Sequence, residues 1–230
     1  LFLRERRKLR MTEAGGRFLP IARELERGFR TADAFGAAPH KDWPDLKLGV
    51  LHSVAGHHLQ SLIEALSAHF EMELIEGTDT ELRAAIRSGR ANMILTLLRD
   101  GEKGPSVMPL LSEPYVMLLP GGHAMEEQEI LEPDDLAAEI MIARRSCEML
   151  EATSRFFSRR GIRPRFALRS VSDDRCVQMV AAGLGITTAP LSFVRAGTVA
   201  RPVRGYDFTR HIGLITDAAW IDHGQNAQIM

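Results

Sequence analysis

Residues 46–97 read LKLGVLHSVAGHHLQSLIEALSAHFEMELIEGTDTELRAAIRSGRANMILTL, and strand-like and helical patterns alternate along this stretch. Its first six residues alternate as a strand does. The segment that follows repeats its apolar residues every three or four positions, as an amphipathic helix does. The expected elements are strands at residues 46–51, 72–75 and 92–97, and helices at residues 56–70 and 79–88. Strands alternating with such helices predict an α/β fold with a largely parallel sheet.

The second half of the chain repeats this alternation. Its expected elements are strands at residues 115–119, 139–143, 165–171, 185–189 and 210–215, and helices at residues 147–160 and 173–182. Two similar α/β halves predict two lobes facing across a cleft, with ligands beyond the carboxyl ends of the strands. The chain crosses at residues 118–120 and returns after Pro190. We therefore expect a discontinuous first lobe, residues 46–118 plus 200–220, and a second lobe of residues 119–199.

Composition limits the class of protein. A length of 230 residues exceeds the usual single domain, and 45% hydrophobic and 26% charged residues are ordinary for a soluble globular chain. There is no run of 18 uncharged apolar residues, which argues against a membrane span. Cys147 and Cys176 are the only cysteines and lack CxxC spacing. This argues against a disulfide framework or a structural zinc site and fits the cytoplasm.

The first 30 residues differ in charge from the rest of the chain. They hold nine Lys or Arg and four Glu, although the whole chain has a net charge of −1. Thr12 is placed to cap a helix with an apolar stripe, in which we expect Pro20 to cause an interruption or a kink. The stripe consists of Phe18, Ile21, Ala22, Leu25 and Phe29. A solitary amphipathic helix must bury this face, and a second copy of the chain is one candidate partner.

Several of these motifs resemble LysR-type transcriptional regulators. The pattern Leu1-Phe2-x-Arg4 followed by Leu9-Arg10-Met11-Thr12-Glu13-Ala14-Gly15 resembles the wing and linker-helix start of that family. The effector domain resembles it at Leu48-Gly49-Val50, residues 74–77, 82–89, 118–124 and 135–137, and most specifically at Val180-Ala181-Ala182-Gly183-Leu184-Gly185-Ile186 with Pro190. The chain departs from the family at Asn92, where Asp is usual, and in residues 221–230, which we leave uninterpreted.

The resemblance implies a fold and a function. It implies a residual DNA-binding wing and dimerisation linker helix at residues 1–35, a hinge at 36–45, and a two-lobed effector-binding domain, like periplasmic binding proteins, at 46–220. The family's helix-turn-helix lies upstream of the wing, so the resemblance implies a fragment of a longer protein. Expected partners are DNA, an anionic or polar small-molecule effector, further copies of the chain as a dimer or tetramer, and RNA polymerase. The DNA-contacting candidates are Arg4, Arg6, Arg7 and Lys8.

Small hydroxyl residues and one thiol lie at strand ends and helix starts. The effector-binding candidates are Ser53, Thr78, Thr96, Ser146, Cys147 and Ser172. Free N–H groups at helix N-termini with hydroxyls beside them make anion sites, although any single Ser or Thr there can be an ordinary N-cap. As a group they occur where the resemblance places the effector. By that resemblance, the stronger candidates for effector binding are Ser53, Thr78, Ser146 and Ser172. Arg144 and Arg145, just before Ser146, are either cations that bind a carboxylate of the effector or ordinary solvated side chains.

Other chemistry has weaker support in the sequence. His52, His57 and His58 lie close together in the sequence. They are more often part of a polar loop that enters a helix than a metal site. Cys147 is either a packed or ligand-facing thiol or a redox sensor, and the family's peroxide sensors use a closer cysteine pair than residues 147 and 176. We find no paired acid and base, no activated nucleophile and no cofactor motif, so we expect neither an enzyme nor a bound cofactor.

Two alternative functions remain open from sequence alone. A solute-binding protein of periplasmic type shares the two-lobe arrangement, but the basic wing and the linker helix argue against it. An enzyme on the same fold would need the catalytic group that the sequence lacks.

Overall fold

The computed structural model describes residues 1–5, 8–35 and 44–221. The chain divides into two units, Leu1–Trp43 and Pro44–Met230, which we describe separately. The first unit holds an antiparallel hairpin of β1 (Phe2–Glu5) and β2 (Lys8–Met11), followed by the helix α1 (Glu13–Phe35). Arg6 and Arg7 lie outside the described residues, and only the backbone positions of Arg4 and Lys8, in β1 and β2, are described.

Short contacts at Thr12 join this hairpin to the start of α1. The Thr12 backbone N–H and its hydroxyl both donate to the carbonyl of Leu1, at 2.9 and 3.0 Å. The same hydroxyl accepts from the N–H of Gly15, so Thr12 caps the helix as expected. A side chain on Gly15 would come within 2.3 Å of the Leu1 carbonyl oxygen. Gly15 is therefore required by the close approach of helix and strand.

Pro20 does not end α1, in contrast to the interruption we expected. The helix continues from Glu13 to Phe35 with Pro20 inside it. Pro20 lacks the N–H that would bond to the carbonyl of Gly16, and glycine at that position gives the backbone room to adjust around the proline ring. The apolar stripe is exposed, with Phe18 at 41%, Leu25 at 55% and Phe29 at 71%. Among the described residues, no helix combines the length and the apolar character that a membrane crossing needs.

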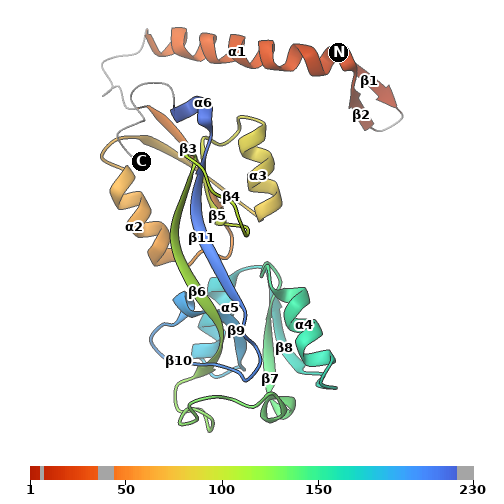
Figure 1. Cartoon of the computed structure of the whole chain (residues 1–230), viewed down its shortest axis with the longest axis vertical. Helices are drawn as coiled ribbons and strands as arrows, with labels where there is room; N and C mark the ends of the chain where they lie inside the picture. Colours follow the sequence, from red (N-terminus) through yellow and green to blue (C-terminus); the bar gives the residue numbers. More distant parts are fainter. Residues whose placement is uncertain (6–7, 36–43, 222–230) are drawn as a thin grey trace. The chain divides into compact units, whose positions relative to one another are not determined.

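The second unit is built on a mixed sheet (Figure 1). Its strand order is β10-β6-β11-β5-β3-β4, and β9 also pairs with β6. The strands are β3 (Asp45–Leu51), β4 (Glu71–Gly77), β5 (Met93–Leu97), β6 (Val107–Pro120), β9 (Thr187–Pro190), β10 (Thr198–Arg201) and β11 (Thr209–Thr216). Only β3, β4 and β5 pair in parallel, whereas β6 and β11 are antiparallel to their neighbours. Within this sheet, the parallel pairing expected from sequence is thus limited to these three strands.

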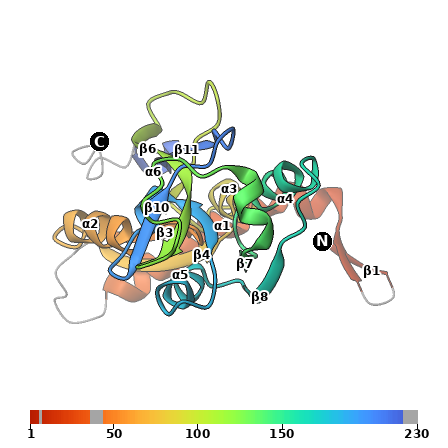
Figure 2. The same cartoon turned by 90° about the horizontal axis from the view of Figure 1, so that it is seen from below.

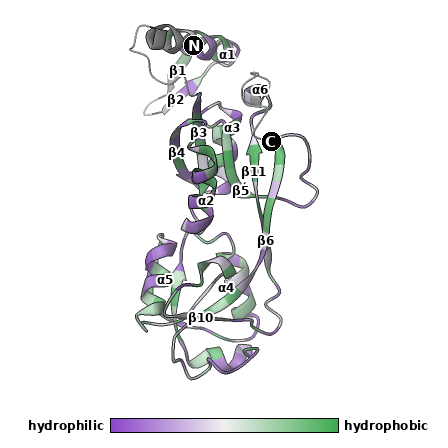
Figure 3. Cartoon of the chain, turned by 90° about the vertical axis from the view of Figure 1, so that its left-hand side faces the viewer, coloured by the Kyte–Doolittle hydropathy of each residue, from purple (hydrophilic) through white to green (hydrophobic). Residues whose placement is uncertain are grey.

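Two helices cover opposite sides of the parallel strands, α2 (Gly56–Leu66) and α3 (Asp79–Arg87) (Figure 1 and Figure 2). Because the connections run from β3 to β4 and then back to β5, right-handed crossovers put the two helices on different faces. The core between them includes Leu46, Leu48 and Ile94, and Figure 3 shows hydrophobic residues along β5 and the adjoining strands. Asn92, at the usual Asp position, still supplies an acceptor, since its Oδ1 takes the Lys47 N–H at 2.8 Å.

The remaining elements surround the other end of β6. The short α6 (Ala218–Ile221) is the exception and lies beside the first core. The others are β7 (Ile140–Arg144) and β8 (Arg165–Ser170), which pair in parallel, α4 (Leu150–Ser158), α5 (Asp173–Ala181), and the 3₁₀ turns η1 (Pro133–Ala138) and η2 (Leu191–Phe193). Their hydrophobic residues form two cores, one including Leu131, Phe156 and Tyr206 and the other including Leu118, Val177 and Phe193. These two cores are separate from the core at β3, β4 and β5.

Strand β6 sets the boundary between the lobes. Its residues 107–114 pair with β11, and its residues 115–120 pair with β9 and β10. We define lobe I as residues 44–114 plus 209–221, and lobe II as residues 115–208. The limits expected from sequence, 118/119 and 199/200, stay a prediction, and residues 118–120, on which the first limit rests, are the last residues of β6.

Candidate functional site

A cavity of about 1130 Å³ lies between the two lobes. Lobe I supplies the carboxyl ends of β3 and β4 and the N-termini of α2 and α3, and lobe II supplies the N-terminus of α5 and the segments around residues 145 and 194. Thr78, Ser146 and Ser172 line this one cavity from both lobes, as three of the four stronger candidates were expected to do. Their part in ligand binding stays a prediction.

Two of the three helix N-termini at the cavity already have partners. The Thr78 hydroxyl accepts from the N–H of Glu81, and the Glu81 carboxylate accepts from the Thr78 N–H, a capping box that starts α3. These hydrogen bonds lower the pKa of Glu81. Ser172 caps α5 by accepting from the N–H of Arg175, with Asp173 and Asp174 in the first turn. The dipoles of both helices are therefore offset by the chain's own carboxylates.

The N-terminus of α2 differs from the other two. Its N-cap residue, Ala55, makes no side-chain cap, and there is no acidic residue in the first turn, which begins at Gly56 and His57. The positive end of this helix therefore faces the cavity without a carboxylate of its own. An anion placed there would receive backbone N–H bonds and a favourable dipole.

The charged side chains around the cavity are mostly paired. Arg195 donates to Asp174 at 2.6 Å, and Asp173 is bound by Arg144. Arg145 is exposed and has no ion-pair partner among residues 1–5, 8–35 and 44–221, and the same holds for Glu76. In this described part of the chain there is no group of three or more His, Cys, Asp or Glu residues that would hold a metal ion.

The LysR substrate binding domain model matches residues 44–219, which is most of the chain and both lobes. The chain belongs to this family. The E. coli DNA-binding transcriptional dual regulator OxyR is 29% identical over 227 residues, covering 94% of this chain and 74% of that relative. The HTH-type transcriptional regulator TtuA of Agrobacterium vitis is 27% identical over 198 residues, covering 83% of this chain and 65% of TtuA. The match thus spans less than two thirds of TtuA.

Solved structures show the same fold as this LysR substrate binding domain. The reduced form of OxyR gives a TM-score of 0.61 at 24% identity, covering 81% of this chain and 92% of that one. The regulatory domain of CcmR from Synechocystis, in complex with 2-PG, gives a TM-score of 0.62 at 17% identity, covering 81% and 97%. At these identities the likeness is one of fold, a two-lobed α/β domain.

Three of the expected site residues of this LysR substrate binding domain do not line the cavity. Ser53 is fully buried, and its hydroxyl and carbonyl accept hydrogen bonds from Arg210 at 3.1 and 2.8 Å. The Thr96 hydroxyl is fully buried and donates to Asp79 at 3.0 Å. Cys147 lines a different cavity, inside lobe II. The hydroxyls were selected because they lie at strand ends. That rule does not show that Ser53 and Thr96 already make hydrogen bonds within the protein, to Arg210 and Asp79.

A buried ionic network around Arg210 joins the two lobes. The Arg210 guanidinium donates to Glu113 at 2.9 Å and to Glu148 at 2.9 Å, besides its bonds to Ser53. Glu113 also accepts from the N–H and the hydroxyl of Ser192, at 2.7 and 3.1 Å. Ser53 and Arg210 belong to lobe I, and Glu148 and Ser192 to lobe II. Sequence reasoning missed this network; its signal was one acidic residue, Glu113, in β6 and one arginine, Arg210, in β11.

Burial and charge act in opposite directions on Glu148 within this network. Burial alone would raise its pKa, but the Arg210 charge and the hydrogen bonds from the Tyr115 and Ser53 hydroxyls outweigh it and lower the pKa. Tyr115 donates its hydroxyl to the same carboxylate, and burial, followed by that negative charge, raises the pKa of Tyr115. Glu148 is therefore ionised, and Tyr115 protonated, at neutral pH.

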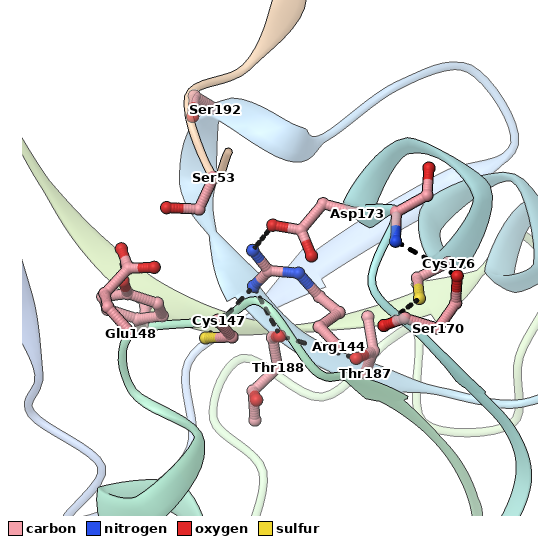
Figure 4. Close-up of polar contacts among 12 residues, drawn as sticks. Ser53, Arg144, Cys147, Glu148, Ser170, Asp173, Cys176, Thr187, Thr188 and Ser192 are labelled. Carbon is pink, nitrogen blue, oxygen red and sulfur yellow. Dashed lines mark hydrogen bonds and ion pairs between the residues drawn. The ribbon is translucent and has the colours of Figure 1, made fainter. Parts of the chain in front are cut away.

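A second buried pair, Arg144 and Asp173, lies in lobe II (Figure 4). The side chains are 2% and 3% exposed, and Arg144 also donates to the Thr188 carbonyl at 3.1 Å. Cys147 is 3.7 Å from the same guanidinium, but burial raises the pKa of its thiol despite that positive charge. Cys176, also buried, lies against the Ala143 carbonyl at 3.8 Å. Neither cysteine is in a disulfide.

Proposed function

We propose that this protein is the linker and effector-binding part of a LysR-type transcriptional regulator. The observation that carries the proposal is the cavity between the lobes, lined from both sides within a domain of the LysR family. The regulators OxyR and TtuA, which match over much of the chain, support it. A solute-binding protein or an enzyme would not account for the basic hairpin and the exposed stripe of α1.

The cavity gives a physical route from effector to DNA. A ligand that touches both lobes binds one arrangement of them better than another, and it shifts the equilibrium by that difference in affinity. We propose that the effector is a small anion whose charged group binds at the N-terminus of α2, with Ser146 and Arg145 from lobe II as further donors. Thr78 and Ser172 shape the same cavity, although their hydroxyls also cap helices.

The remaining roles follow from the first unit. We propose that Arg4, Arg6, Arg7 and Lys8 contact DNA phosphates, and that α1 pairs with α1 of a second copy. DNA binding places the protein in the cytoplasm, with RNA polymerase as a further partner. No enzymatic activity is proposed, because the regulators that match this chain are named for control of transcription.

The charge of the effector can be tested at Gly56. A side chain at Gly56 meets no atom within 4 Å, so Gly56→Glu is expected to fold and to place a carboxylate on the uncapped N-terminus of α2. We expect it to weaken binding of an anionic effector at least tenfold, the loss of about one charged hydrogen bond. The measurement is ligand-induced thermal stabilisation across a panel of small carboxylates.

The matched control is Gly56→Gln, which has the same size without the charge. It is expected to retain most of the stabilisation. Equal binding by Gly56→Glu and the original chain would contradict the anion site at α2. Loss of binding with both variants would indicate a steric effect, and the proposal that the effector is an anion would then be unsupported.

Peroxide sensing is not favoured for this chain, although several relatives are named as hydrogen peroxide-inducible genes activators. The reactive form of cysteine is the thiolate, and burial raises the pKa of both Cys147 and Cys176. We expect a short exposure to a small excess of hydrogen peroxide to leave both thiols unmodified. Intact-protein mass spectrometry after thiol alkylation checks this, with denatured protein as the reactive control. A Cys147–Cys176 disulfide in the native protein would contradict the expectation.

A further inference from the structure

A second cavity, of about 740 Å³, lies inside lobe II between α4 and the paired strands β7 and β8. It is distinct from the cavity between the lobes, although Arg145, the residue after β7, lines both. Much of its lining is apolar and includes Phe157 and Ile162, both buried. Leu150 and Phe166 also line it and are 41% and 39% exposed. A volume in this range is typical of sites for small organic ligands.

Exposed arginines contribute to the lining of this cavity. Residues 152–172 contain six arginines and no acidic residue. Of these, Arg163 and Arg169 line the cavity, together with Arg145, which follows β7. Arg169 lies over the Phe166 ring at 4.7 Å, and none of the three has an ion-pair partner in the described ranges 1–5, 8–35 and 44–221. Glu151, the acidic residue of the lining, is already paired with Arg155 at 2.8 Å.

The deepest charged group of the lining also lacks part of its hydrogen bonding. Arg144 is 3% exposed, and its Nε is buried without a partner. Its other nitrogens bind Asp173 and the Thr188 carbonyl. A buried donor without an acceptor is costly, but Arg144 already binds Asp173 and Thr188, so the exposed Arg163 and Arg169 remain as cations of the lining that can bind a ligand.

We propose that this lobe II cavity binds a second ligand, an apolar carboxylate. Its hydrocarbon or aromatic body would lie against Phe157, Ile162 and Phe166, and its carboxylate would bind the exposed Arg163 and Arg169. Arginine suits this role because its planar group donates two parallel hydrogen bonds to a carboxylate. The two features, a largely apolar lining and exposed arginines without ion-pair partners in the described residues, select an amphipathic anion over a neutral apolar molecule or a fully polar anion.

The test uses a fluorescent amphipathic anion, 8-anilinonaphthalene-1-sulfonate, on the intact folded chain. Decanoate is expected to displace the probe, whereas decanol, of equal chain length, and acetate, of equal charge, are expected to displace it at least tenfold less well. The variant Arg163→Gln/Arg169→Gln is expected to weaken decanoate binding at least tenfold. Ser154→Trp, which fills the cavity from an exposed lining position, is expected to abolish displaceable probe binding.

Two controls separate this site from others. Arg159→Gln/Arg165→Gln removes the same charge from exposed arginines of the same segment that do not line the cavity, and is expected to bind normally. Gly56→Glu alters only the cavity between the lobes and is also expected to bind normally, so failure here and failure of the proposed effector site are distinguishable. Equal displacement by decanol, equal weakening by the control double variant, or normal binding by folded Ser154→Trp would overturn the proposal.

Discussion

Replacing Arg210 with methionine is expected to destabilise the protein by about 3–5 kcal/mol, the range for breaking one side of a buried ion pair. Arg210 is 4% exposed and neutralises both Glu113 and Glu148, at 2.9 Å each. Methionine keeps most of the volume but leaves two carboxylates in the apolar junction of the lobes without a cation. Urea unfolding at pH 7 measures the change in the free energy of unfolding.

The same variant is expected to reverse the pH dependence of stability at this site. In the original chain the pKa of Glu148 is lower folded than unfolded, so its contribution is present above the unfolded pKa and is lost as the pH falls through the folded pKa. Without Arg210, burial dominates and the pKa of Glu148 is expected to rise above its unfolded value. The difference in stability between the two proteins should therefore shrink as the pH falls from 7 to 5.

Two further variants make this test specific. Arg210→Met/Glu113→Gln/Glu148→Gln removes the stranded charges and is expected to recover much of the loss. Arg204→Met breaks an exposed pair with Glu132, with side chains 64% and 49% exposed, and is expected to cost less than about 1 kcal/mol. A loss of that small size for Arg210→Met at pH 7 would refute the buried-network argument.

Charging the stripe of α1 is expected to weaken self-association at least a hundredfold. Ile21 and Leu25 are 52% and 55% exposed, and burying one such side chain against a partner contributes about 1.5–3 kcal/mol. Ile21→Glu/Leu25→Glu removes two of these contributions from each copy and adds charge to the paired surface. Sedimentation velocity over a micromolar concentration series would measure the change in dissociation constant.

Arg23→Glu is the matched control, because it changes the net charge by the same amount on the opposite side of α1. It is expected to leave association close to that of the original chain. If the original chain is already a monomer at these concentrations, or if both variants dissociate alike, then the α1 stripe does not mediate association. Residual dimers of the stripe variant would point to a further contact through the second unit.

The features that follow local periodicity were predictable from the sequence. Leu46 and Leu48 on a strand, the apolar face of α2 and the Thr12 cap are all local patterns, and the structure contains each of them. Strand β6 was only partly found, because Pro109 and Pro114 interrupt the strand pattern of residues 107–114. Prolines suit that part of the strand only where the ladder does not need their N–H, which local sequence does not reveal.

The candidate site was predictable in position but not in its hydrogen bonding. Thr78, Ser146 and Ser172 were found because strand ends and helix starts share one edge of each lobe. Ser53 follows the same rule, yet its partner Arg210 is 157 residues away in the chain. Pairings at such separation depend on how the lobes pack, and no local pattern of residues records them. The uncapped N-terminus of α2 is the opposite case, since the absence of a capping side chain or an acid at residues 55–57 can be read from sequence.

The chain passes from lobe I to lobe II through β6 and returns through β11, and this determines which stretches of the sequence form each lobe. Lobe II is a single uninterrupted insertion, residues 115–208, whereas lobe I is split around it. The two ends of that insertion lie side by side, because Pro114 pairs directly with Thr209 and the Tyr115 N–H bonds to the Phe208 carbonyl at 2.8 Å. A two-residue Asn-Gly turn between Pro114 and Thr209 would therefore close lobe I as a hairpin. This shortened chain would contain lobe I alone, with β3, β4, β5, α2 and α3. Glu113 and Arg210 would be replaced by apolar residues, because Glu148 and Ser192, their partners in lobe II, would be missing.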